Sequence, residues 1–172
     1  MQYVMKYKSP VGDMLLAADD IGLFGVWLTN EKYFASALGQ DYIETSTPIL
    51  EAGKAWLDQY FEGKVPTVKV PLHFVGTEFR KLVWEFLLEI PYGKTITYGE
   101  LAKKVAAKKG LRQMSAQAVG GAVGHNELSI IVPCHRVVGA NGNLTGYAGG
   151  LDRKVFFLKL EGAYKDDFYL PK

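Results

Sequence analysis

Residues 97–123 read TYGELAKKVAAKKGLRQMSAQAVGGAV, and their pattern indicates two short helices joined by a turn. Thr97 and Glu100 have the spacing of a capping box, in which the two side chains satisfy backbone N–H groups at the start of a helix. That helix is predicted to run to about Ala107, and a second helix to cover residues 115–123. With five Lys or Arg residues around them, the two segments predict a DNA-binding helix-turn-helix, although the connection is longer than is usual in a tight motif.

The second predicted helix is unusually poor in side-chain bulk. Its two adjacent glycines, Gly120 and Gly121, each cost roughly 1 kcal/mol relative to alanine in a helix interior, so something must approach this helix closely. Small residues suit either a sugar-phosphate chain or tight packing against another helix, and the pattern favours DNA. The residues that we expect to contact DNA are Arg112, Ser115, Gln117, Ala118, Gly121 and Arg136.

Charge is distributed unevenly along the 172 residues. The stretch 1–75 carries six Lys and Arg residues against nine Asp and Glu residues, for a net charge of −3. The remainder carries fourteen against nine, for a net charge of +5. A basic half joined to an acidic half is typical of a protein with a polyanionic partner, but a solvated lysine-rich surface explains the charge equally well.

The first part of the chain predicts a small β-meander followed by a helix. Alternating apolar residues between turn-forming clusters predict three strands, at residues 3–8, 14–18 and 23–28. Thr47 and Pro48 are an N-cap and a first helical residue, and Gly63 ends that helix. Its expected apolar face is Ile49, Gly53, Trp56 and Tyr60, backed by Leu50, Leu57 and Phe61.

An extended connector that contains Pro66 and Pro71 follows, with a last strand expected at 68–72. Beyond it, Thr77 is expected to cap a helix with a clean 3.6-residue apolar period, ended by Pro91. We therefore expect an α+β protein with an antiparallel sheet in the first domain and a helical second domain. The predicted domains are residues 1–75 and 76–172.

Residues 130–138 form an apolar run that is broken by one compact polar cluster. Such a run is normally a buried strand, but Pro133 lacks an N–H group and should bend the chain. Cys134 and His135 follow it directly, and a thiolate next to a base is a nucleophile. Two explanations without a catalytic role compete with this one. A lone cysteine is usually a small buried hydrophobe, and neighbouring side chains often point apart.

Composition excludes several classes of protein. A single cysteine permits no internal disulfide, and one Cys with three His makes a closed zinc site improbable, so we expect no metal and no cofactor. No apolar run approaches the roughly 18 residues that span a bilayer, so no membrane association is expected. The N-terminus lacks the pattern of a signal peptide, which predicts a cytoplasmic protein.

The sequence from Pro133 to Val137, PCHRV, resembles the active-site motif of the O6-alkylguanine-DNA alkyltransferases, also called methylated-DNA–protein-cysteine methyltransferases. The likeness is dense over residues 76–162 and looser before them. Other segments in the order and spacing of that family are GTEF at 76–79, IPYG at 90–93, VGGA at 119–122, GHN at 124–126, LTGYAGGL at 144–151 and LKLEG at 158–162.

Position by position, the resemblance implies a role for each member of a catalytic set. Cys134 resembles the alkyl acceptor, His135 the base that activates it through a water, and Glu161 the carboxylate that orients this histidine. Asn126 resembles the residue that organises the active-site turn, and Tyr98 the tyrosine that assists departure of guanine. As bland alternatives, Tyr98 is a core residue and Glu161 a solvated carboxylate at a helix end.

The resemblance also implies a pocket for the base and a single-use reaction. The base pocket is expected to be lined by Val132, Pro133, Tyr147 and Ala148. The implied activity is direct, irreversible transfer of an alkyl group from O6-alkylguanine in double-stranded DNA to Cys134, by a monomer that flips the nucleotide out from the minor groove. The family often carries an Arg on the recognition helix to fill the gap left by the base, and here that position is Gln117, with Arg112 as a nearby competitor.

Three other functions compete with alkyl transfer. A damage-recognition protein of the alkyltransferase-like kind holds the lesion without repairing it and lacks the acceptor cysteine. A transcription regulator needs no Cys134, His135 and Glu161 together. A cysteine hydrolase needs Cys and His from separate elements, and His73 and His125 lie in contexts more typical of surface or core histidines.

Overall fold

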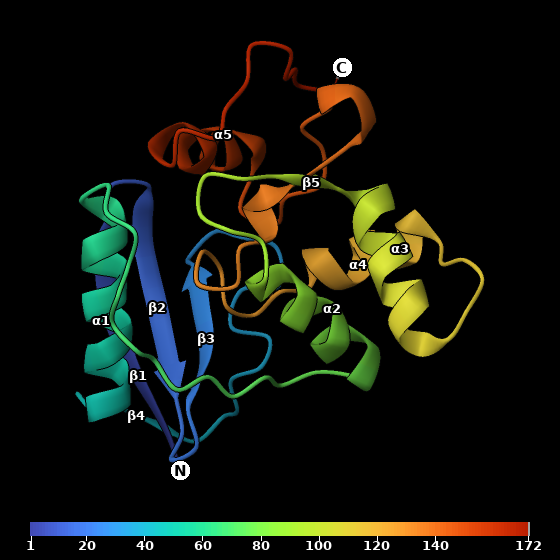
Figure 1. Ribbon diagram of the computed structural model, residues 1–172. Helices are drawn as coiled ribbons and strands as arrows, with labels where there is room; N and C mark the ends of the chain where they lie inside the picture. Colours follow the sequence, from blue (N-terminus) through green and yellow to red (C-terminus); the bar gives the residue numbers. More distant parts are fainter. Residues whose placement is uncertain (172) are drawn as a thin grey trace. The chain divides into compact units, whose positions relative to one another are not determined.

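The computed structural model describes residues 1–171, which form two compact units (Figure 1). The units are residues 1–76 with 127–131, and residues 77–126 with 132–171. A single domain boundary was expected, after residue 75. Segment 127–131 was not expected to belong to the first unit, but the chain leaves the second unit there and returns to it just before Cys134. The α+β class is confirmed.

The first unit is built on a four-stranded sheet in the order β3-β2-β1-β4. The predicted meander is present as three antiparallel strands, β1 (Gln2–Ser9), β2 (Gly12–Ala18) and β3 (Leu23–Leu28). A short strand that the sequence did not predict, β4 (Tyr42–Glu44), pairs in parallel with β1. All three of its residues are exposed, so no apolar pattern marks it.

Helix α1 (Pro48–Phe61) packs on this sheet through a face that includes a glycine. Thr47 caps the helix by accepting a hydrogen bond from the Leu50 backbone, as predicted. The buried face consists of Leu50, Gly53, Leu57 and Tyr60, whereas the predicted Ile49 and Trp56 are only half-buried. A Cβ at Gly53 would lie 3.2 Å from Leu23 Cδ2, so the glycine permits close approach of helix and sheet.

The strand expected at 68–72 is reduced to one isolated parallel bridge between Leu72 and Leu23. Pro71, which lacks an N–H group, nevertheless offers its carbonyl to the Leu23 amide at 2.8 Å. Proline therefore limits this segment to a minimal pairing with the sheet.

Segment 127–131 adds to the other part of the same strand, beside Val26 of β3. The Val26 amide donates to the Glu127 carbonyl, and the Val26 carbonyl accepts from the Ser129 amide. The buried Glu127 carboxylate also accepts hydrogen bonds from Trp27 Nε1 at 3.1 Å and Ser36 Oγ at 2.7 Å. The chain that leads to the cysteine is thus fixed to the first unit by backbone and side-chain bonds.

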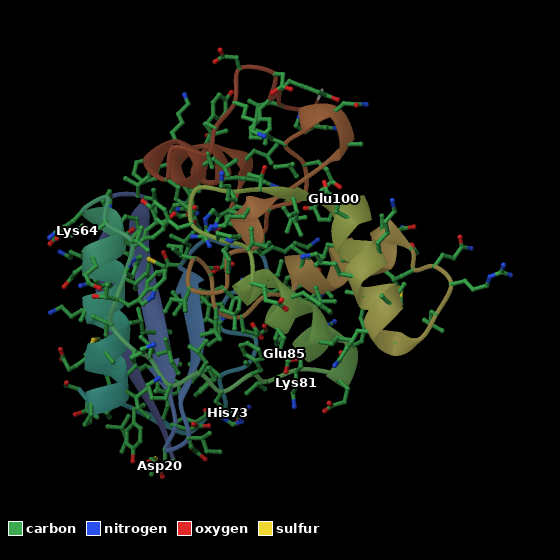
Figure 2. All side chains as sticks on the ribbon, viewed as in Figure 1. Asp20, Lys64, His73, Lys81, Glu85 and Glu100 are labelled. Carbon is green, nitrogen blue, oxygen red and sulfur yellow. The ribbon has the colours of Figure 1, made fainter. Side chains whose placement is uncertain are left out.

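The second unit contains the three predicted helices in the predicted order, and a fourth, α5, that was not predicted. They are α2 (Glu78–Leu88), α3 (Tyr98–Lys109), α4 (Ala116–Gly124) and α5 (Leu151–Leu160). The capping box of Thr97 and Glu100 is present, and Glu100 lies at the start of α3 (Figure 2). Gly110 ends α3 in the left-handed conformation at φ +69°, and Ser115 caps α4. The result is the expected helix-turn-helix.

Buried contacts hold α2 against α4. Trp84 of α2 is buried and donates its indole N–H to the Ala122 carbonyl at 2.9 Å. Two short parallel strands, β5 (Ile96–Thr97) and β6 (Val137–Val138), connect the start of α3 to the chain that follows Cys134. These contacts place the start of α3 beside the segment that follows Cys134.

The apolar run 130–138 is bent, as Pro133 predicted, and two tight turns do the bending. The Ile131 amide donates to the Ser129 carbonyl at 2.8 Å, around Ile130 with φ +72°. A β-branched residue is rarely found at positive φ, so this turn is strained. The Cys134 amide closes a second three-residue turn, around Pro133, onto the Val132 carbonyl.

Candidate active site

Cys134 begins a 3₁₀ turn, η1 (Cys134–Arg136), and is almost completely buried. Asn126 holds the preceding turn in place, because its Nδ2 donates to the Val132 carbonyl at 2.8 Å. That carbonyl oxygen also accepts a hydrogen bond from the Cys134 amide, so it binds both the Asn126 side chain and the cysteine backbone. The structure therefore brings Asn126 and Cys134 together, as expected from the sequence.

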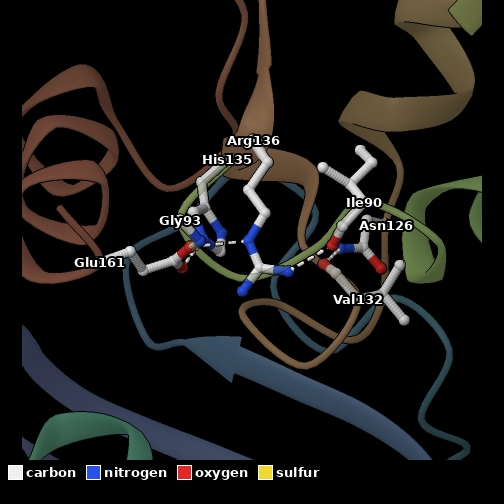
Figure 3. A network of polar contacts seen from close by, with 7 residues as sticks. All are labelled: Ile90, Gly93, Asn126, Val132, His135, Arg136 and Glu161. Carbon is white, nitrogen blue, oxygen red and sulfur yellow. Dashed lines mark hydrogen bonds and ion pairs between the residues drawn. The ribbon is translucent and has the colours of Figure 1, made fainter. Parts of the chain in front are cut away.

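His135 and Glu161 form a buried pair, which Figure 3 shows with its neighbours. His135 Nε2 lies 2.5 Å from Glu161 Oε2, although the two residues are 26 positions apart in the sequence. The second carboxylate oxygen accepts from Arg136 Nε at 2.8 Å and from the Gly93 amide at 3.1 Å. Both oxygens of Glu161 are therefore engaged by donors, and the carboxylate is rigidly held.

Electrostatics fix the charge state of this pair. Burial raises the pKa of Glu161, but the hydrogen bonds and charges of His135 and Arg136 outweigh burial and hold that pKa at about 2. Burial lowers the pKa of His135, and the opposing effect of Glu161 does not fully compensate. At neutral pH the site then holds an ionised Glu161 and a neutral His135 with its proton on Nε2. Nδ1 is the basic nitrogen of that tautomer.

Arg136 corrects one expectation from the sequence. It was predicted to contact DNA, but its side chain is 9% exposed, and Nη1 donates to the Ile90 carbonyl at 2.8 Å. With Nε on Glu161, the guanidinium is a buried partner of the Glu161 carboxylate. A guanidinium in this position is not available to a phosphate.

Lys154 is a site residue that sequence analysis missed, although it is fully buried. Its Nζ donates to the Val137 carbonyl at 2.6 Å and to the Thr145 carbonyl at 2.9 Å. Burial lowers the pKa of Lys154 to about 8, and interaction with Cys134 opposes this shift. A signal was present: Lys154, Phe157, Leu158 and Glu161 recur at the spacing of one helix face, and all four are buried.

Tyr98, at the start of α3, meets the loop that the sequence assigned to the base pocket. Its hydroxyl lies 3.1 Å from the Thr145 carbonyl and 3.0 Å from the Gly146 carbonyl. Burial raises its pKa, and so does interaction with Cys134. Gly146 is required there, since a Cβ would approach the Tyr98 hydroxyl to 2.8 Å at a φ of +73°.

Loop 144–149 carries the two remaining residues expected at the base pocket, Tyr147 and Ala148. Both are half-buried, and the Tyr147 ring packs edge-on against Phe157 of α5. Phe157 in turn lies 5.3 Å, between ring centroids, from His135. The loop and the His–Glu pair are therefore linked through one aromatic side chain.

The outer face of α4 is exposed and, apart from Gln117, carries only small residues. The residues expected there to contact DNA, which are Arg112, Ser115, Gln117, Ala118 and Gly121, are all exposed. A Cβ at Gly121 would meet no described atom within 4 Å, whereas one at Gly120 would make an ordinary 3.8 Å contact with Tyr98. Packing inside the protein does not require a glycine at either position, so helix–helix packing fails to explain them.

Two negative observations concern residues 1–171. In this part of the chain, no group of three or more His, Cys, Asp or Glu side chains is arranged to hold a metal ion. No helix there is long and apolar enough to cross a membrane.

A buried Cys134 next to a His–Glu pair, in one unit with a helix-turn-helix, defines a protein with a nucleophilic thiol and a DNA-binding motif. Two family descriptions match nearly the whole chain: "6-O-methylguanine DNA methyltransferase, ribonuclease-like domain" over residues 3–74, and the DNA-binding domain of the same family over residues 78–163. The chain belongs to the 6-O-methylguanine DNA methyltransferase family.

Individual relatives agree with this membership. A methylated-DNA–protein-cysteine methyltransferase of Methanosarcina acetivorans is 44% identical, over 94% of this chain and 99% of the relative. One from Mycobacterium leprae is 42% identical, over 94% of this chain and 93% of the relative. The crystal structure of the O6-methylguanine methyltransferase of Mycobacterium tuberculosis is similar with a TM-score of 0.79 and 38% identity, covering 95% of this chain and 94% of that one.

Proposed function

We propose that this protein repairs DNA by moving an alkyl group from O6-alkylguanine onto Cys134. The observation that carries the proposal is the buried Cys134, followed in the chain by a histidine whose Nε2 is held 2.5 Å from Glu161. Family membership supports the same reaction, because the curated relatives are named methylated-DNA–protein-cysteine methyltransferases. A related Mycobacterium tuberculosis protein with a TM-score of 0.79 has been solved in complex with DNA, which supports DNA as the partner.

The first step is removal of the thiol proton. Neutral His135, with Nε2 turned to Glu161, accepts that proton at Nδ1 through a water molecule. The ionised Glu161 then stabilises the imidazolium cation that forms. The Lys154 ammonium provides a second positive charge that interacts with the sulfur of Cys134. This arrangement favours the thiolate, which is the reactive form of cysteine.

The second step is displacement at the alkyl carbon. A bond forms between Cys134 Sγ and that carbon, the bond to guanine O6 breaks, and its electron pair stays on the base. A proton from the Tyr98 hydroxyl neutralises the departing guanine, and solvent returns a proton to the tyrosine. The raised pKa of Tyr98 keeps its proton in place until negative charge develops on the base. To donate, the hydroxyl exchanges the carbonyls of loop 144–149 for the guanine ring.

The product is a thioether, which has no leaving group comparable to guanine. Each molecule is therefore consumed by one reaction, and repair is stoichiometric. In this proposal the protein acts as a monomer without a cofactor, because the nucleophile, the base and the acid all come from one chain.

The alkyl group is hard to reach inside a duplex, so the nucleotide must be flipped out into the pocket lined by Val132, Pro133, Tyr147 and Ala148. The exposed outer face of α4 is the proposed contact with the minor groove, with Gly121 permitting close approach of the sugar-phosphate chain. Gln117, the second residue of α4, is the long side chain on that face, and we assign to it the gap left by the flipped base.

The decisive experiment mixes the protein with an excess of a duplex oligonucleotide that carries one O6-methylguanine. Intact mass spectrometry and peptide mapping should show one methyl group on Cys134 and no repair beyond one equivalent. An unmodified duplex is the control, and Cys134→Ala should bind DNA without removing methyl groups. Sustained turnover, or methylation at another residue, contradicts the proposal. Tight binding with no mass gain would instead make this a damage-recognition protein.

A further inference from the structure

The chain continues beyond α5 into a C-terminal tail, residues 163–171, that returns to the segment before loop 144–149. In Figure 1 this red tail runs beside the orange segment around residue 140. The Leu144 amide donates to the Tyr169 carbonyl at 2.8 Å, and the Tyr169 amide donates to the Gly142 carbonyl at 3.0 Å. Most of the tail lies outside the family's match, which ends at residue 163.

Side chains reinforce these backbone bonds. Phe168 and Ala163 of the tail are buried in one apolar cluster with Val138, Leu144 and Leu158. Leu144 has no exposed surface at all. Burial of apolar surface contributes roughly 25 cal/mol per Å², which offsets the entropy lost when these groups are ordered. The tail therefore stabilises the segment that it covers.

Gly142 shows how closely the two segments fit. A Cβ at this position would lie 2.7 Å from the Asp167 carbonyl oxygen, and the φ of Gly142 is +86°. Only glycine satisfies both conditions without displacing the tail. The contact is therefore built into the sequence from both sides, by Gly142 on one segment and by Phe168 on the other.

Residues 142–144, which the tail contacts, lead directly into the site. One residue after Leu144, the Thr145 carbonyl accepts from Lys154 Nζ, and the hydroxyl of Tyr98 lies within hydrogen-bond distance of the same oxygen. A shift at Leu144 would therefore move the carbonyls that hold Lys154 and Tyr98. Tyr147, on the proposed wall of the base pocket, is only three residues further along.

We propose that the C-terminal tail is a positioning element for the alkylguanine pocket, acting through loop 144–149. The inference rests on the proposed function, because it assigns that loop to the base. Without the tail, the loop samples other conformations, and the free base is bound and oriented less well. The His135–Glu161 pair is held by Arg136 and Gly93, which lie outside the tail, so we expect activation of the thiol by this pair to be retained.

Two substitutions at Tyr169 separate backbone from side chain. Tyr169→Pro removes the N–H that donates to Gly142, whereas Tyr169→Ala keeps it and deletes a side chain that is half-exposed. We expect Tyr169→Pro to slow reaction of Cys134 with the free base O6-benzylguanine on the order of tenfold, mainly by raising the half-saturating concentration. Tyr169→Ala should react as the unaltered protein does. Alkylation of Cys134 by iodoacetamide should be equal in all three proteins.

A second pair approaches the contact from the loop side. Gly142→Ala should reproduce the defect, and Gly63→Ala is its control, because Gly63 has a similar φ of +82° but open space around it. Hydrogen exchange of the amides of residues 144–149, in protein without any substrate, should accelerate in Tyr169→Pro and Gly142→Ala only.

The outcomes separate this inference from the proposed function. If exchange accelerates but even the unaltered protein transfers no alkyl group, the tail holds the loop and the proposed function is wrong. If exchange and O6-benzylguanine kinetics are unchanged in Tyr169→Pro and Gly142→Ala, the inference is overturned. An equal loss of iodoacetamide reactivity also overturns it, because the tail would then act on the whole unit.

Discussion

Helix α4 presents an exposed face of small residues with one long side chain, Gln117, whereas α5 and its C-cap carry two buried charged side chains, Lys154 and Glu161. Both helices belong to the second unit. An exposed glycine such as Gly121 lowers helix stability and leaves room for something outside the protein. A buried charge needs compensating partners and prepares chemistry inside the protein. We therefore expect DNA binding to depend on the absence of side-chain atoms on α4, and the reaction to depend on the charges buried at α5.

Removing one of the charges buried at α5 should give the largest effect on stability and on alkyl transfer. Glu161→Gln leaves the buried Arg136 without its anionic partner, and breaking such a pair costs about 3–5 kcal/mol in the free energy of unfolding. We expect urea unfolding at pH 7 to show this loss, and alkyl transfer to slow on the order of 100-fold. Glu85→Gln, an exposed carboxylate on α2 (Figure 2), is the matched control and should change neither.

The pH dependence of the same carboxylate follows from its lowered pKa. Glu161 titrates at about 2 in the folded protein and near 4.3 in the unfolded chain. Its contribution to stability is therefore complete above about pH 4.3 and is lost as the pH falls towards 2. The difference in stability between the unaltered protein and Glu161→Gln should shrink over that range. A constant difference would show that Glu161 is not held as an anion.

Lys154 should show the smaller, pH-dependent counterpart. Its pKa is about 8 when folded and about 10.4 when unfolded, so the unfolded chain binds more protons between these values. Stability contributed by this group is then complete above pH 10.4 and is lost as the pH falls to 8, by on the order of 3 kcal/mol. Lys154→Met should remove this part of the pH dependence, as measured by urea unfolding from pH 7 to 10.

The control for this experiment is Lys159→Met, which changes an exposed lysine on the same helix. Its pH dependence should match that of the unaltered protein. If Lys154→Met also keeps the full dependence, the ammonium is less buried than the structure places it. The contrast between α4 and α5 would then lose one of its two buried charges.

Local signals in the sequence account for much of the fold. Caps such as Thr47, Thr77 and Thr97 are local signals, and each begins its helix where predicted. Pro133 correctly predicted a bend, because a missing N–H group is a local property. β4 was missed because its exposed residues have no apolar pattern, and segment 127–131 was missed because its partners lie about 100 residues away.

The candidate site was predictable in part through the family resemblance. The resemblance supplied Glu161 and Tyr98, and the structure brings Glu161 to His135 and Tyr98 to loop 144–149. Arg136 was assigned to DNA, and only the three-dimensional structure reveals its buried carboxylate partner, which lies 25 residues away in the sequence. Lys154 was missed because a lysine is assumed to be solvated, even though its spacing matched the buried face of α5.

The DNA side of the comparison should give the smallest effect on stability, and of the opposite sign. Gly121→Ala adds a methyl group in open space and removes the conformational entropy cost of a mid-helix glycine, so the protein should become more stable by about 0.5–1 kcal/mol. The same methyl group faces the proposed minor-groove contact. Affinity for duplex DNA, measured by fluorescence anisotropy at fixed salt, should fall by roughly five- to tenfold.

Gly120→Ala separates stability from binding, because its added methyl group would make only an ordinary contact with the Tyr98 ring. This variant should gain the same stability as Gly121→Ala and keep the DNA affinity of the unaltered protein. A more stable Gly121→Ala that binds DNA normally would place the DNA elsewhere, and the bare face of α4 would need another explanation. Reaction with free O6-benzylguanine should be unchanged in Gly121→Ala, since the free base needs no contact with α4. A loss of affinity limited to Gly121→Ala would show that this glycine serves the partner rather than the fold.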